Sequence, residues 1–471
     1  MTSGESAAAD YDLIVIGGGP TGENVADYAT RRGIRVAIVE SELVGGECSY
    51  WACMPSKALL RGGHALRAAR RVAGAREAVT GTVDPAATLA RRTAFADNWT
   101  DDGQVAWLAS AGIDLIRGHA RLAGARSIEV GGRVYSARAV ALATGSVPVI
   151  PSVPGLADAR PWGTREATSA DHVPPRLIVV GGGVAGAELA FAFASLGSRV
   201  TLLSRSGLLD REEPFAGEQV RSAMVKEGID VRSGVTLAHV GRDSAGTVTA
   251  TLEDGDELQA DEIVVATGRR PNTEDLGLES IGMDAALVVD DTLCVAGTDW
   301  LYAVGDVNGR SVLTHQGKYQ ARAAGEAIAA RLNGTPLADR PWGQHVATAD
   351  HAAVPRVMFT DPEIAAVGLT ERQARETGLR VTAVEYDLGW VSGAKLHADA
   401  YTGRAKIVVD EDRQVIVGAT FVGQDVAELL QSATIVIVGE VTIDRLWHAV
   451  PAYPTMSEIW LRLLETYGRP A

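Results

Sequence analysis

The sequence predicts an α/β fold with two doubly wound segments of the same design and an α+β region at the C-terminal end. Near the N-terminus, a short apolar run, a glycine-rich turn, a helical stretch and a second apolar run follow one another, and the same order recurs from residue 177. From about residue 347 onward, strand patterns and helices occur without such a turn. Alternation between strand and helix is typical of parallel sheets covered by helices, so we expect two such units followed by a domain of another kind.

Length and charge exclude several classes of protein. The chain has 471 residues, enough for about three domains, with 44 Lys and Arg against 59 Asp and Glu and a net charge of −15. Nucleic acids and anionic membranes both require a basic face, so neither is an expected partner. No apolar run approaches the ~20 residues that span a bilayer, no secretory signal is recognisable, and three cysteines are too few for a disulfide scaffold. We therefore expect a cytoplasmic protein.

The first βαβ segment predicts a dinucleotide site. An expected strand over residues 11–16 leads into a G-x-G-x-x-G turn, a helix over 23–32 and a strand over 35–40 that ends in Glu40. In such a turn the first glycine allows the tight bend, the second lets a pyrophosphate approach, and the third permits close helix packing, while the acid accepts hydrogen bonds from a ribose. A merely structural turn is the alternative, but the surrounding strand, helix and acid favour a dinucleotide. The glycines concerned are Gly17, Gly19 and Gly22.

The second βαβ segment repeats this pattern with a different ending. An expected strand over 177–180, a helix over 187–196 and a strand over 199–203 surround the second turn, whose glycines are Gly181, Gly183 and Gly186. No acid follows the second strand; the residues that occupy this region are Ser204, Arg205 and Arg211. A carboxylate here would repel a 2′-phosphate, whereas arginine attracts it and binds it bidentately. The pattern favours NADPH over NADH, with solvated surface arginines as the alternative.

Two of the three cysteines form a C-x4-C pair in front of an expected helix. Cys48 and Cys53 follow two glycines and precede Pro55, a residue typical of the first turn of a helix. The spacing lets the sulfurs meet in a small disulfide loop, and a helix N-terminus lowers thiol pKa values, which suits a reactive dithiol. A metal site would need further cysteine or histidine ligands nearby, which this stretch does not offer. The third cysteine, Cys294, is expected to be a buried small apolar residue in a strand.

These motifs, in this order, resemble those of the pyridine nucleotide–disulfide oxidoreductases, the family of glutathione reductase, dihydrolipoamide dehydrogenase and mercuric reductase. The likeness runs from Tyr11 to Leu464. Beyond the two glycine turns and their helices, it rests on five stretches: Gly45 to Leu60 (GGECSYWACMPSKALL), Ala143 to Ser146 (ATGS), Ala266 to Thr273 (ATGRRPNT), Tyr302 to Asp306 (YAVGD) and Pro454 to Glu458 (PTMSE).

The resemblance implies FAD at the first site and NADPH at the second, with a hydride passing from NADPH to the flavin. Asp306 is implied as the residue that holds the ribityl chain of FAD. The residues assigned to FAD in this way are Gly17, Gly19, Gly22, Glu40, Gly46, Lys57, Thr144, Gly145 and Asp306. The residues assigned to NADPH are Gly181, Gly183, Gly186, Ser204, Arg205, Arg211 and Gly268.

The resemblance also implies the catalytic residues. Cys53 is expected as the thiolate against the flavin and Cys48 as the sulfur that faces the substrate. Lys57 is expected near the reactive edge of the flavin, paired with Glu188. Family members complete each active site from a second subunit, which implies a homodimer. The residues expected to reach across are Tyr453 and Glu458.

The C-terminal motif departs from that of the thiol-handling members. They have a histidine directly before Pro-Thr, hydrogen-bonded to a glutamate five residues later, whereas this chain has Tyr453 and keeps Glu458. A phenol, with a pKa of about 10, is a poor base at neutral pH. The tyrosine resembles mercuric reductase, as does the stretch from Arg205 to Pro214, although residues 467–471 carry no cysteine pair of the kind that ends that enzyme. Two other candidates for a base are His315 and His448.

The expected domains are an FAD-binding domain in two segments (1–150 and 275–345), an NADPH-binding domain (151–274) and an interface domain (346–471), with one or two long surface helices within 62–110. The favoured function is an NADPH-oxidising flavoprotein that reduces a Cys48–Cys53 disulfide and then a small disulfide or similar acceptor. A reductase of quinones, metal ions or oxygen is the alternative. Dihydrolipoamide dehydrogenase activity and a slow redox-sensing role are less favoured.

Overall fold

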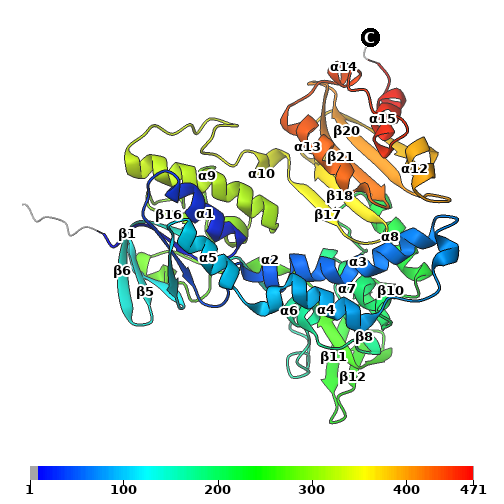
Figure 1. The fold of residues 1–471 in the computed structure, drawn as a ribbon, viewed down its shortest axis with the longest axis horizontal. Helices are drawn as coiled ribbons and strands as arrows, with labels where there is room; N and C mark the ends of the chain where they lie inside the picture. The colour runs from blue at the N-terminus through cyan, green and yellow to red at the C-terminus, as the bar shows by residue number, and fades with distance from the viewer. Residues whose placement is uncertain (1–8, 470–471) are drawn as a thin grey trace, which may run out of the picture. The chain divides into compact units, whose positions relative to one another are not determined.

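The computed structural model describes residues 9–469 and divides into two compact units, each assembled from three stretches of chain (Figure 1). The described residues of the first unit are 9–54, 95–148 and 269–350, and those of the second are 55–94, 149–268 and 351–469. Both units contain a parallel sheet covered by helices, and the second also contains an antiparallel sheet near the C-terminus. The predicted α/β class is confirmed.

The first unit is built on a sheet in the order β3-β2-β1-β6-β16, in which neighbouring strands are parallel. The beginning of β6 extends past this sheet and pairs antiparallel with β5, which in turn pairs with β4. Parallel strands covered on both faces read as unbroken apolar runs, as the early strand does. The strands are β1 (Tyr11–Ile16), β2 (Val36–Glu40), β3 (Asp114–Arg117), β4 (Ala120–Gly124), β5 (Ser127–Val130), β6 (Arg133–Leu142) and β16 (Leu301–Ala303).

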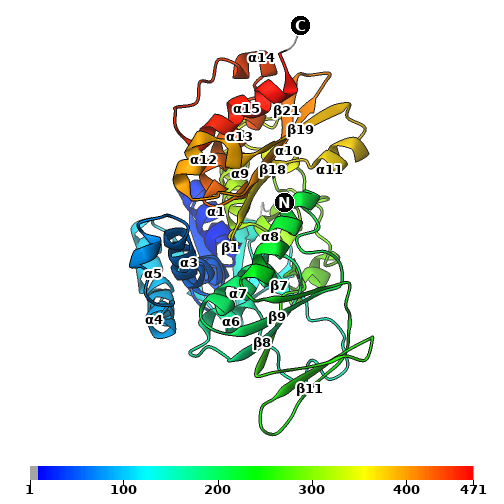
Figure 2. The same cartoon turned by 90° about the vertical axis from the view of Figure 1, so that its right-hand side faces the viewer.

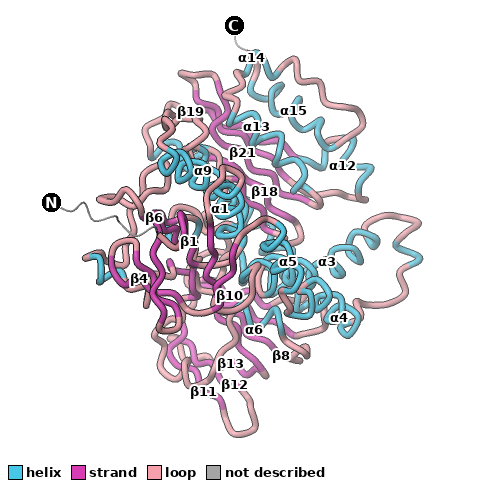
Figure 3. The backbone as a smooth tube through the Cα atoms, turned by 60° about the vertical axis from the view of Figure 1, so that its left-hand side comes forward, coloured by secondary structure: helices cyan, strands magenta, loops and turns pink. Residues whose placement is uncertain are grey.

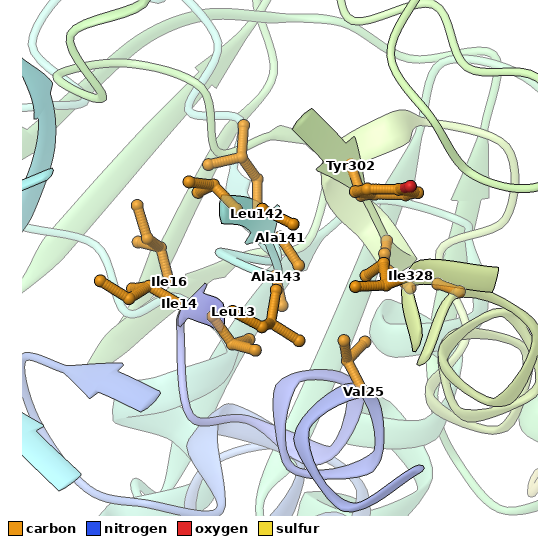
Figure 4. Packing of buried hydrophobic residues seen from close by; sticks show 14 of the residues in the cluster. Leu13, Ile14, Ile16, Val25, Ala141, Leu142, Ala143, Tyr302 and Ile328 are labelled. Carbon is orange, nitrogen blue, oxygen red and sulfur yellow. The ribbon is translucent and has the colours of Figure 1, made fainter. Parts of the chain in front are cut away.

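Two helices from opposite ends of the sequence cover this sheet side by side, α1 (Pro20–Thr30) and α9 (Thr314–Asn333) (Figures 1 and 3). Their apolar side chains meet those of the strands in one buried cluster that includes Leu13, Val25 and Ile328 (Figure 4). Burying one such side chain contributes roughly 1.5–3 kcal/mol, so this contact joins the late segment of the unit firmly to the early one. The shorter elements of the unit are α2 (Gly46–Tyr50), α5 (Asp102–Ser110), β7 (Ser146–Pro148) and β15 (Arg269–Pro271).

Each glycine turn begins with a glycine in a backbone conformation that other amino acids do not adopt easily. Gly17 has a φ of +104° and Gly181 a φ of +128°, a region in which a Cβ is strained. A Cβ at Gly17 would also collide with the carbonyl group of Ala143, and one at Gly181 with that of Ala266. The two turns therefore have the same geometry, as their sequences predicted.

The second unit contains a parallel sheet in the order β10-β9-β8-β14 and a separate antiparallel sheet, β11-β12-β13 (Figure 3). The helix α7 (Val184–Ser195) is apolar on all sides and buried along most of its length. A helix of this kind must be covered all round. Its side chains share one core with Leu202 of the sheet and Leu60 of α3 (Cys53–Arg70). The other elements are α4 (Pro85–Phe95), α6 (Thr164–Ser169), α8 (Pro214–Lys226), β8 (Arg176–Val180), β9 (Arg199–Ser204), β10 (Asp230–Ser233), β11 (Leu237–Arg242), β12 (Val248–Leu252), β13 (Glu257–Ala260) and β14 (Glu262–Val265).

The C-terminal part of the second unit is an antiparallel sheet in the order β17-β18-β21-β20-β19, with helices packed against it (Figure 2). The two strands predicted here, over 406–409 and 415–422, are present. The elements are β17 (Pro355–Met358), β18 (Glu363–Gly368), β19 (Val381–Asp387), β20 (Arg404–Asp410), β21 (Val415–Gly423), α10 (Ala349–Ala352), α11 (Glu371–Glu376), α12 (Ser392–His397), α13 (Leu430–Val438), α14 (Ile443–Leu446) and α15 (Ile459–Tyr467).

Two local predictions need correction. The stretch 62–110 holds the end of α3 and the separate helices α4 and α5, because α3 ends at Arg70 and a turn through Gly74, whose φ is +89°, follows it. Cys294 is buried, as predicted, but it lies in an isolated bridge to Tyr302 rather than in a strand. Within residues 9–469, no helix is both long and apolar enough to cross a membrane.

The antiparallel sheet contains a carboxyl group that predicts a pH-dependent stability. Burial raises the pKa of Glu363 to about 7, although the N–H of Ala427 donates to its carboxylate at 3.0 Å. An unfolded glutamate has a pKa of about 4.3, so the folded state loses stability as the pH rises from about 4 to about 7. Glu363→Gln keeps an acceptor for the N–H and is expected to stabilise the protein by about 2–3 kcal/mol near pH 8 and not at all near pH 4. Denaturation midpoints of both proteins at the two pH values measure this; an equal shift at both would contradict it.

Candidate active site

The first glycine turn and the end of β2 form one hydrogen-bonded unit. The N–H of Gly18 donates to one carboxylate oxygen of Glu40, and the N–H of Glu42 donates to the other, both at 2.7 Å. The predicted ribose acid is therefore held in place at the strand end. α1 begins at Pro20, before the last glycine of the turn, and the free N–H groups of a helix N-terminus attract phosphate.

The cysteine segment begins in contact with this turn. The Cα of Gly46, the first residue of α2, lies so close to Gly19 that a Cβ at Gly46 would come within 2.8 Å of the Gly19 Cα. Cys48 lies within α2, and Cys53 is the first residue of α3. The structure thus brings the dithiol segment and the first dinucleotide turn together within the first unit.

The two cysteines are thiols in hydrogen-bond contact, and both are partly exposed. The hydrogen bond to Cys53 and, after it, burial raise the pKa of the Cys48 thiol. The Sγ of Cys53 lies 3.3 Å from the hydroxyl oxygen of Thr314, the first residue of α9. The helix that was expected to lower the thiol pKa values begins at Cys53, and Cys48 precedes it; the pKa of the Cys48 thiol is raised instead, by Cys53 and by burial. Thr314 had no motif that could have identified it.

The large residues between the cysteines support the loop. Tyr50 is buried, and its hydroxyl group donates to the carbonyl oxygen of Val44 at 2.9 Å. The indole N–H of Trp99 donates to the Tyr50 carbonyl oxygen at 3.2 Å, and the rings of Tyr50 and Trp51 lie 5.6 Å apart. Tyr50 therefore ties the cysteine segment to the loop that follows β2.

A second polar group of the first unit surrounds Asp306. The hydroxyl of Ser146 donates to the Asp306 carboxylate at 2.6 Å, and burial raises the pKa of this acid. Arg269 donates to the Ser146 hydroxyl at 2.7 Å and pairs with Glu47 at 2.5 Å. This network joins the predicted ribityl residue to the residue next to Cys48. No sequence signal predicted that Arg269 and Glu47 belong to this network.

The predicted residues Thr144 and Gly145 are held next to this network. The Thr144 hydroxyl donates to the carbonyl oxygen of Asn272 at 2.7 Å, and the N–H of Asn272 donates to the Gly145 carbonyl oxygen at 3.0 Å. Gly145 has a φ of +74°, and the predicted nucleotide residue Gly268, in the second unit, has a φ of +131°. Both glycines thus lie in turns that need a positive φ.

In the second unit, Lys57 and Glu188 form an ion pair, as the family pattern implied. The Nζ of Lys57 lies 2.6 Å from one carboxylate oxygen of Glu188, which is only 3% exposed. The N–H of Phe359 donates to the other carboxylate oxygen at 2.9 Å, and the ammonium group lies 5.0 Å from the centre of the Phe359 ring. The acid and the ring fix the position of the Lys57 charge, one turn after Cys53 on α3.

The second glycine turn ends beside exposed basic residues. Ser204 is buried and its hydroxyl donates to the Gly207 carbonyl oxygen at 3.3 Å, whereas Arg205 and Arg211 are exposed. The two acids after Arg211 are buried and paired with cations of the C-terminal sheet. Glu212 and Glu213 therefore do not add exposed carboxylates beside Arg205 and Arg211, although Asp210 is exposed between the two arginines.

Tyr453 and Glu458 have different hydrogen-bond partners. The Tyr453 hydroxyl lies 3.4 Å from that of Ser392, and the side chain is 74% exposed. Glu458 is buried; one carboxylate oxygen accepts from Arg462 at 2.5 Å, and the other has no hydrogen-bond partner among the described residues. Arg462 was not predicted. The alternative bases His315 and His448 are both exposed.

Metal chemistry has no ready-made centre in the described part of the chain. No group of three or more His, Cys, Asp or Glu side chains among residues 9–469 is arranged to hold a metal ion.

Known proteins share both the motifs and the fold. Residues 11–327 match the family model described as pyridine nucleotide-disulphide oxidoreductase, and residues 354–463 match the dimerisation domain of the same family. A mercuric reductase of Staphylococcus aureus is 33% identical over 457 residues, which cover 95% of this chain and 81% of that protein. A dihydrolipoyl dehydrogenase of Thermus scotoductus is 32% identical over 474 residues and 98% of each protein.

A solved structure extends the match to three dimensions. The HOCl-induced flavoprotein disulfide reductase RclA from Escherichia coli aligns with a TM-score of 0.81 and 26% identity, over 97% of this chain and 99% of that chain. Its Cu(II) complex aligns with a TM-score of 0.82. The chain therefore belongs to the pyridine nucleotide-disulphide oxidoreductase family and is an NAD(P)H-dependent flavoprotein oxidoreductase with FAD as its cofactor.

Proposed function

We propose that this chain oxidises NADPH and reduces a disulfide or a related acceptor through Cys48 and Cys53. The observation that carries the proposal is the contact between Gly46 and Gly19, because it joins the dithiol segment to the first dinucleotide turn. The residues of that turn fit FAD: Gly17 permits the tight bend, Gly19 leaves the backbone open to a pyrophosphate, and Glu40 is held where its carboxylate accepts hydrogen bonds from ribose hydroxyls. Asp306, next to Ser146, supplies a further acceptor for the cofactor.

When bound, FAD would supply the chemistry that carries an electron pair from NADPH to a disulfide. The chain's own residues then determine which sulfur of the reduced pair holds the proton and which holds the negative charge. The S–S bond between Cys48 and Cys53 breaks, one sulfur takes the proton and the other keeps a negative charge. The raised pKa of Cys48 makes it the sulfur that holds the proton, and the Thr314 hydroxyl is placed to donate to a Cys53 thiolate. The Lys57 charge, fixed by Glu188, stabilises negative charge in the same region of α3.

NADPH is the proposed donor because of the residues that follow β9. Arg205 and Arg211 are exposed and close in sequence, as a site for a 2′-phosphate requires. Ser204, at the end of the strand, leaves no carboxylate to repel that group. The remaining predicted nucleotide residues belong to the glycine turn itself and to the turn at Gly268.

The acceptor is proposed as a small disulfide, reached by Cys48. An acceptor that needs no base, such as a metal ion or a quinone, is the second candidate, and one observation favours it. The Glu458 carboxylate accepts a hydrogen bond from Arg462, and the Tyr453 hydroxyl lies beside that of Ser392. These two residues therefore do not form a counterpart of the histidine–glutamate base of the thiol-handling relatives. The 33% identity to a mercuric reductase is consistent with this candidate.

The pH dependence of turnover distinguishes these acceptors. Cys48 must ionise to attack a disulfide, and its pKa is raised, so disulfide turnover is expected to rise about tenfold per pH unit between about pH 6 and pH 8. An aromatic disulfide with a coloured thiol product measures this, with a quinone as the second acceptor. A bell-shaped profile centred near neutrality would contradict the absence of a base.

We further propose a homodimer, because exposed apolar residues gather in the region that matches the family's dimerisation domain. They are Trp390, Leu396, Ile435, Val450 and Tyr453. In such a dimer, Tyr453 and Glu458 serve the other subunit's site. We retain the domain boundaries proposed from the sequence, with FAD-binding segments 1–150 and 275–345, NADPH-binding segment 151–274 and interface segment 346–471. A reduced dithiol fed by NADPH is consistent with a cytoplasmic location.

A further inference from the structure

The segment that contains Arg205 and Arg211, the two arginines of the second site, is anchored by buried charges outside that site. We infer that Glu212 and Glu213 are positioning residues for nucleotide selection, because they fasten residues 205–213, the selectivity loop, to the C-terminal sheet. The inference rests on the proposed preference for NADPH. Neither acid needs to touch the nucleotide to act in this way.

The first anchor is a two-pronged ion pair. Glu212 is 8% exposed, and its two carboxylate oxygens accept from the guanidinium group of Arg356 at 3.1 and 3.0 Å. Arg356 lies on β17 and also donates to the carbonyl oxygen of Gly368 on β18 at 3.4 Å. A guanidinium that is itself fixed to two strands holds the carboxylate in both position and orientation.

The second anchor is a buried cluster around one ammonium group. Lys406, on β20, lies 2.9 Å from the carboxylate of Glu213 and 2.7 Å from that of Glu371. Glu213 also accepts from the N–H of Glu371 at 2.8 Å, at the start of α11. Glu213 is 3% exposed and Lys406 6%, so the pair is shielded from salt and water.

The middle of the selectivity loop is attached to the glycine turn. The N–H of Leu209 donates to the carbonyl oxygen of Gly182 at 2.8 Å, and the side chains of Leu208 and Leu209 are buried. Arg211 therefore lies between two fixed points, Leu209 on the turn and Glu212 on the sheet. Its range of positions is limited although its side chain is exposed.

The anchors also remove an electrostatic conflict. Two carboxylates directly after Arg211 would repel a 2′-phosphate if they pointed into solvent beside it. Instead, both acids point into the interior of the second unit, where Arg356 and Lys406 form ion pairs with them and neutralise their charges. Buried ion pairs give little more stability than well-packed apolar residues, so a gain in specificity is a physical reason to have them here.

The test compares NADPH and NADH in three variants of the FAD-loaded enzyme: Glu212→Gln, Arg356→Gln and the double variant. Flavin reduction by each nucleotide is followed at a series of concentrations. Each single variant is expected to raise the KM for NADPH about tenfold, to leave the KM for NADH within about twofold, and to leave kcat unchanged. The double variant is expected to match the singles rather than multiply them, because one interaction is lost in all three.

For Glu212→Gln, the loss of a negative charge and the loss of the anchor predict opposite changes in the KM for NADPH. Removal of a negative charge alone would lower the KM for NADPH, whereas loss of the anchor raises it, so a lowered KM would overturn the inference. A lower melting temperature with an unchanged ratio of NADPH to NADH efficiency would also overturn it. Glu218→Gln, which removes the same charge from the exposed Glu218–Arg221 pair on α8, is the matched control and is expected to change nothing.

Arg211→Gln in the same assay separates this inference from the proposed function. If Arg205→Glu, Arg211→Gln and the Glu212 variants all leave the preference for NADPH unchanged, the proposed NADPH site is wrong. If Arg211→Gln weakens NADPH binding and the anchor variants do not, the NADPH site stands and only the anchoring role is wrong.

Discussion

Cys48→Ser is expected to lower NADPH-dependent disulfide turnover by at least about 10³-fold, while flavin reduction by NADPH stays within about threefold of the wild-type rate. A serine hydroxyl neither forms the Cys48–Cys53 disulfide nor attacks an acceptor. The hydride step depends on the dinucleotide sites, whose residues the substitution does not touch. Steady-state assays with an aromatic disulfide and rapid-mixing measurements of flavin absorbance report the two steps separately.

Cys294→Ser is the matched control for this prediction. Cys294 is buried, its thiol lies 3.4 Å from the Thr298 carbonyl oxygen, and it is remote in sequence from the pair. Both rates of this variant should equal those of the wild type. Disulfide turnover that survived Cys48→Ser would contradict a dithiol relay. Quinone turnover that survived it would identify a route that bypasses the cysteines.

The second large effect is expected at Arg205. Arg205→Glu should lower kcat/KM for NADPH about 100- to 1000-fold, because it removes a charge-assisted hydrogen bond worth about 1.5–3 kcal/mol and adds repulsion of the 2′-phosphate. The efficiency with NADH should change less than about threefold, since NADH has no phosphate at this position. Initial rates of flavin reduction with each nucleotide give the ratio directly.

Arg221→Glu provides the control, since Arg221 is an exposed arginine of the same unit that pairs with Glu218. The variant makes the same change of charge away from the glycine turn and should leave the ratio unaltered. An unchanged preference for NADPH in Arg205→Glu would contradict the assignment of this residue. It would leave Arg211 as the remaining candidate.

Local backbone rules made much of the fold predictable. The tight turns at Gly17 and Gly181 depend on nearby residues alone, and the structure shows the same geometry in both. Helix starts were less accurate: α1 begins at Pro20 and α7 at Val184, each three residues before the predicted start. The last glycine of each turn lies inside the first helical turn, where a sequence pattern reads it as loop.

The family pattern identified residue pairs that composition and spacing could not. Lys57 and Glu188 are far apart in sequence, and their ion pair was implied only by resemblance. Arg462 and Thr314 carry no motif, and their roles depend on side chains that meet only after folding. The raised pKa of Cys48 likewise depends on a contact that folding creates, the proximity of the Cys53 sulfur.

The burial of Glu212 and Glu213 also depends on contacts that the sequence did not predict. In the sequence they follow Arg211 and suggest an acidic surface. Their partners, Arg356 and Lys406, come from strands more than a hundred residues later, and only these contacts turn the acids inward. The charge of a site therefore cannot be read from its nearest neighbours in sequence alone.

An anaerobic titration with NADPH, followed by the visible spectrum of the bound flavin, tests the central claim that electrons pass through the cysteine pair. A dithiol relay predicts a long-wavelength thiolate-to-flavin charge-transfer band in the wild-type enzyme after one equivalent, and a strong loss of that band in Cys53→Ser. NADH should produce it only at much higher concentrations. Direct bleaching of the flavin in the wild-type enzyme, without such a band, would contradict the dithiol relay.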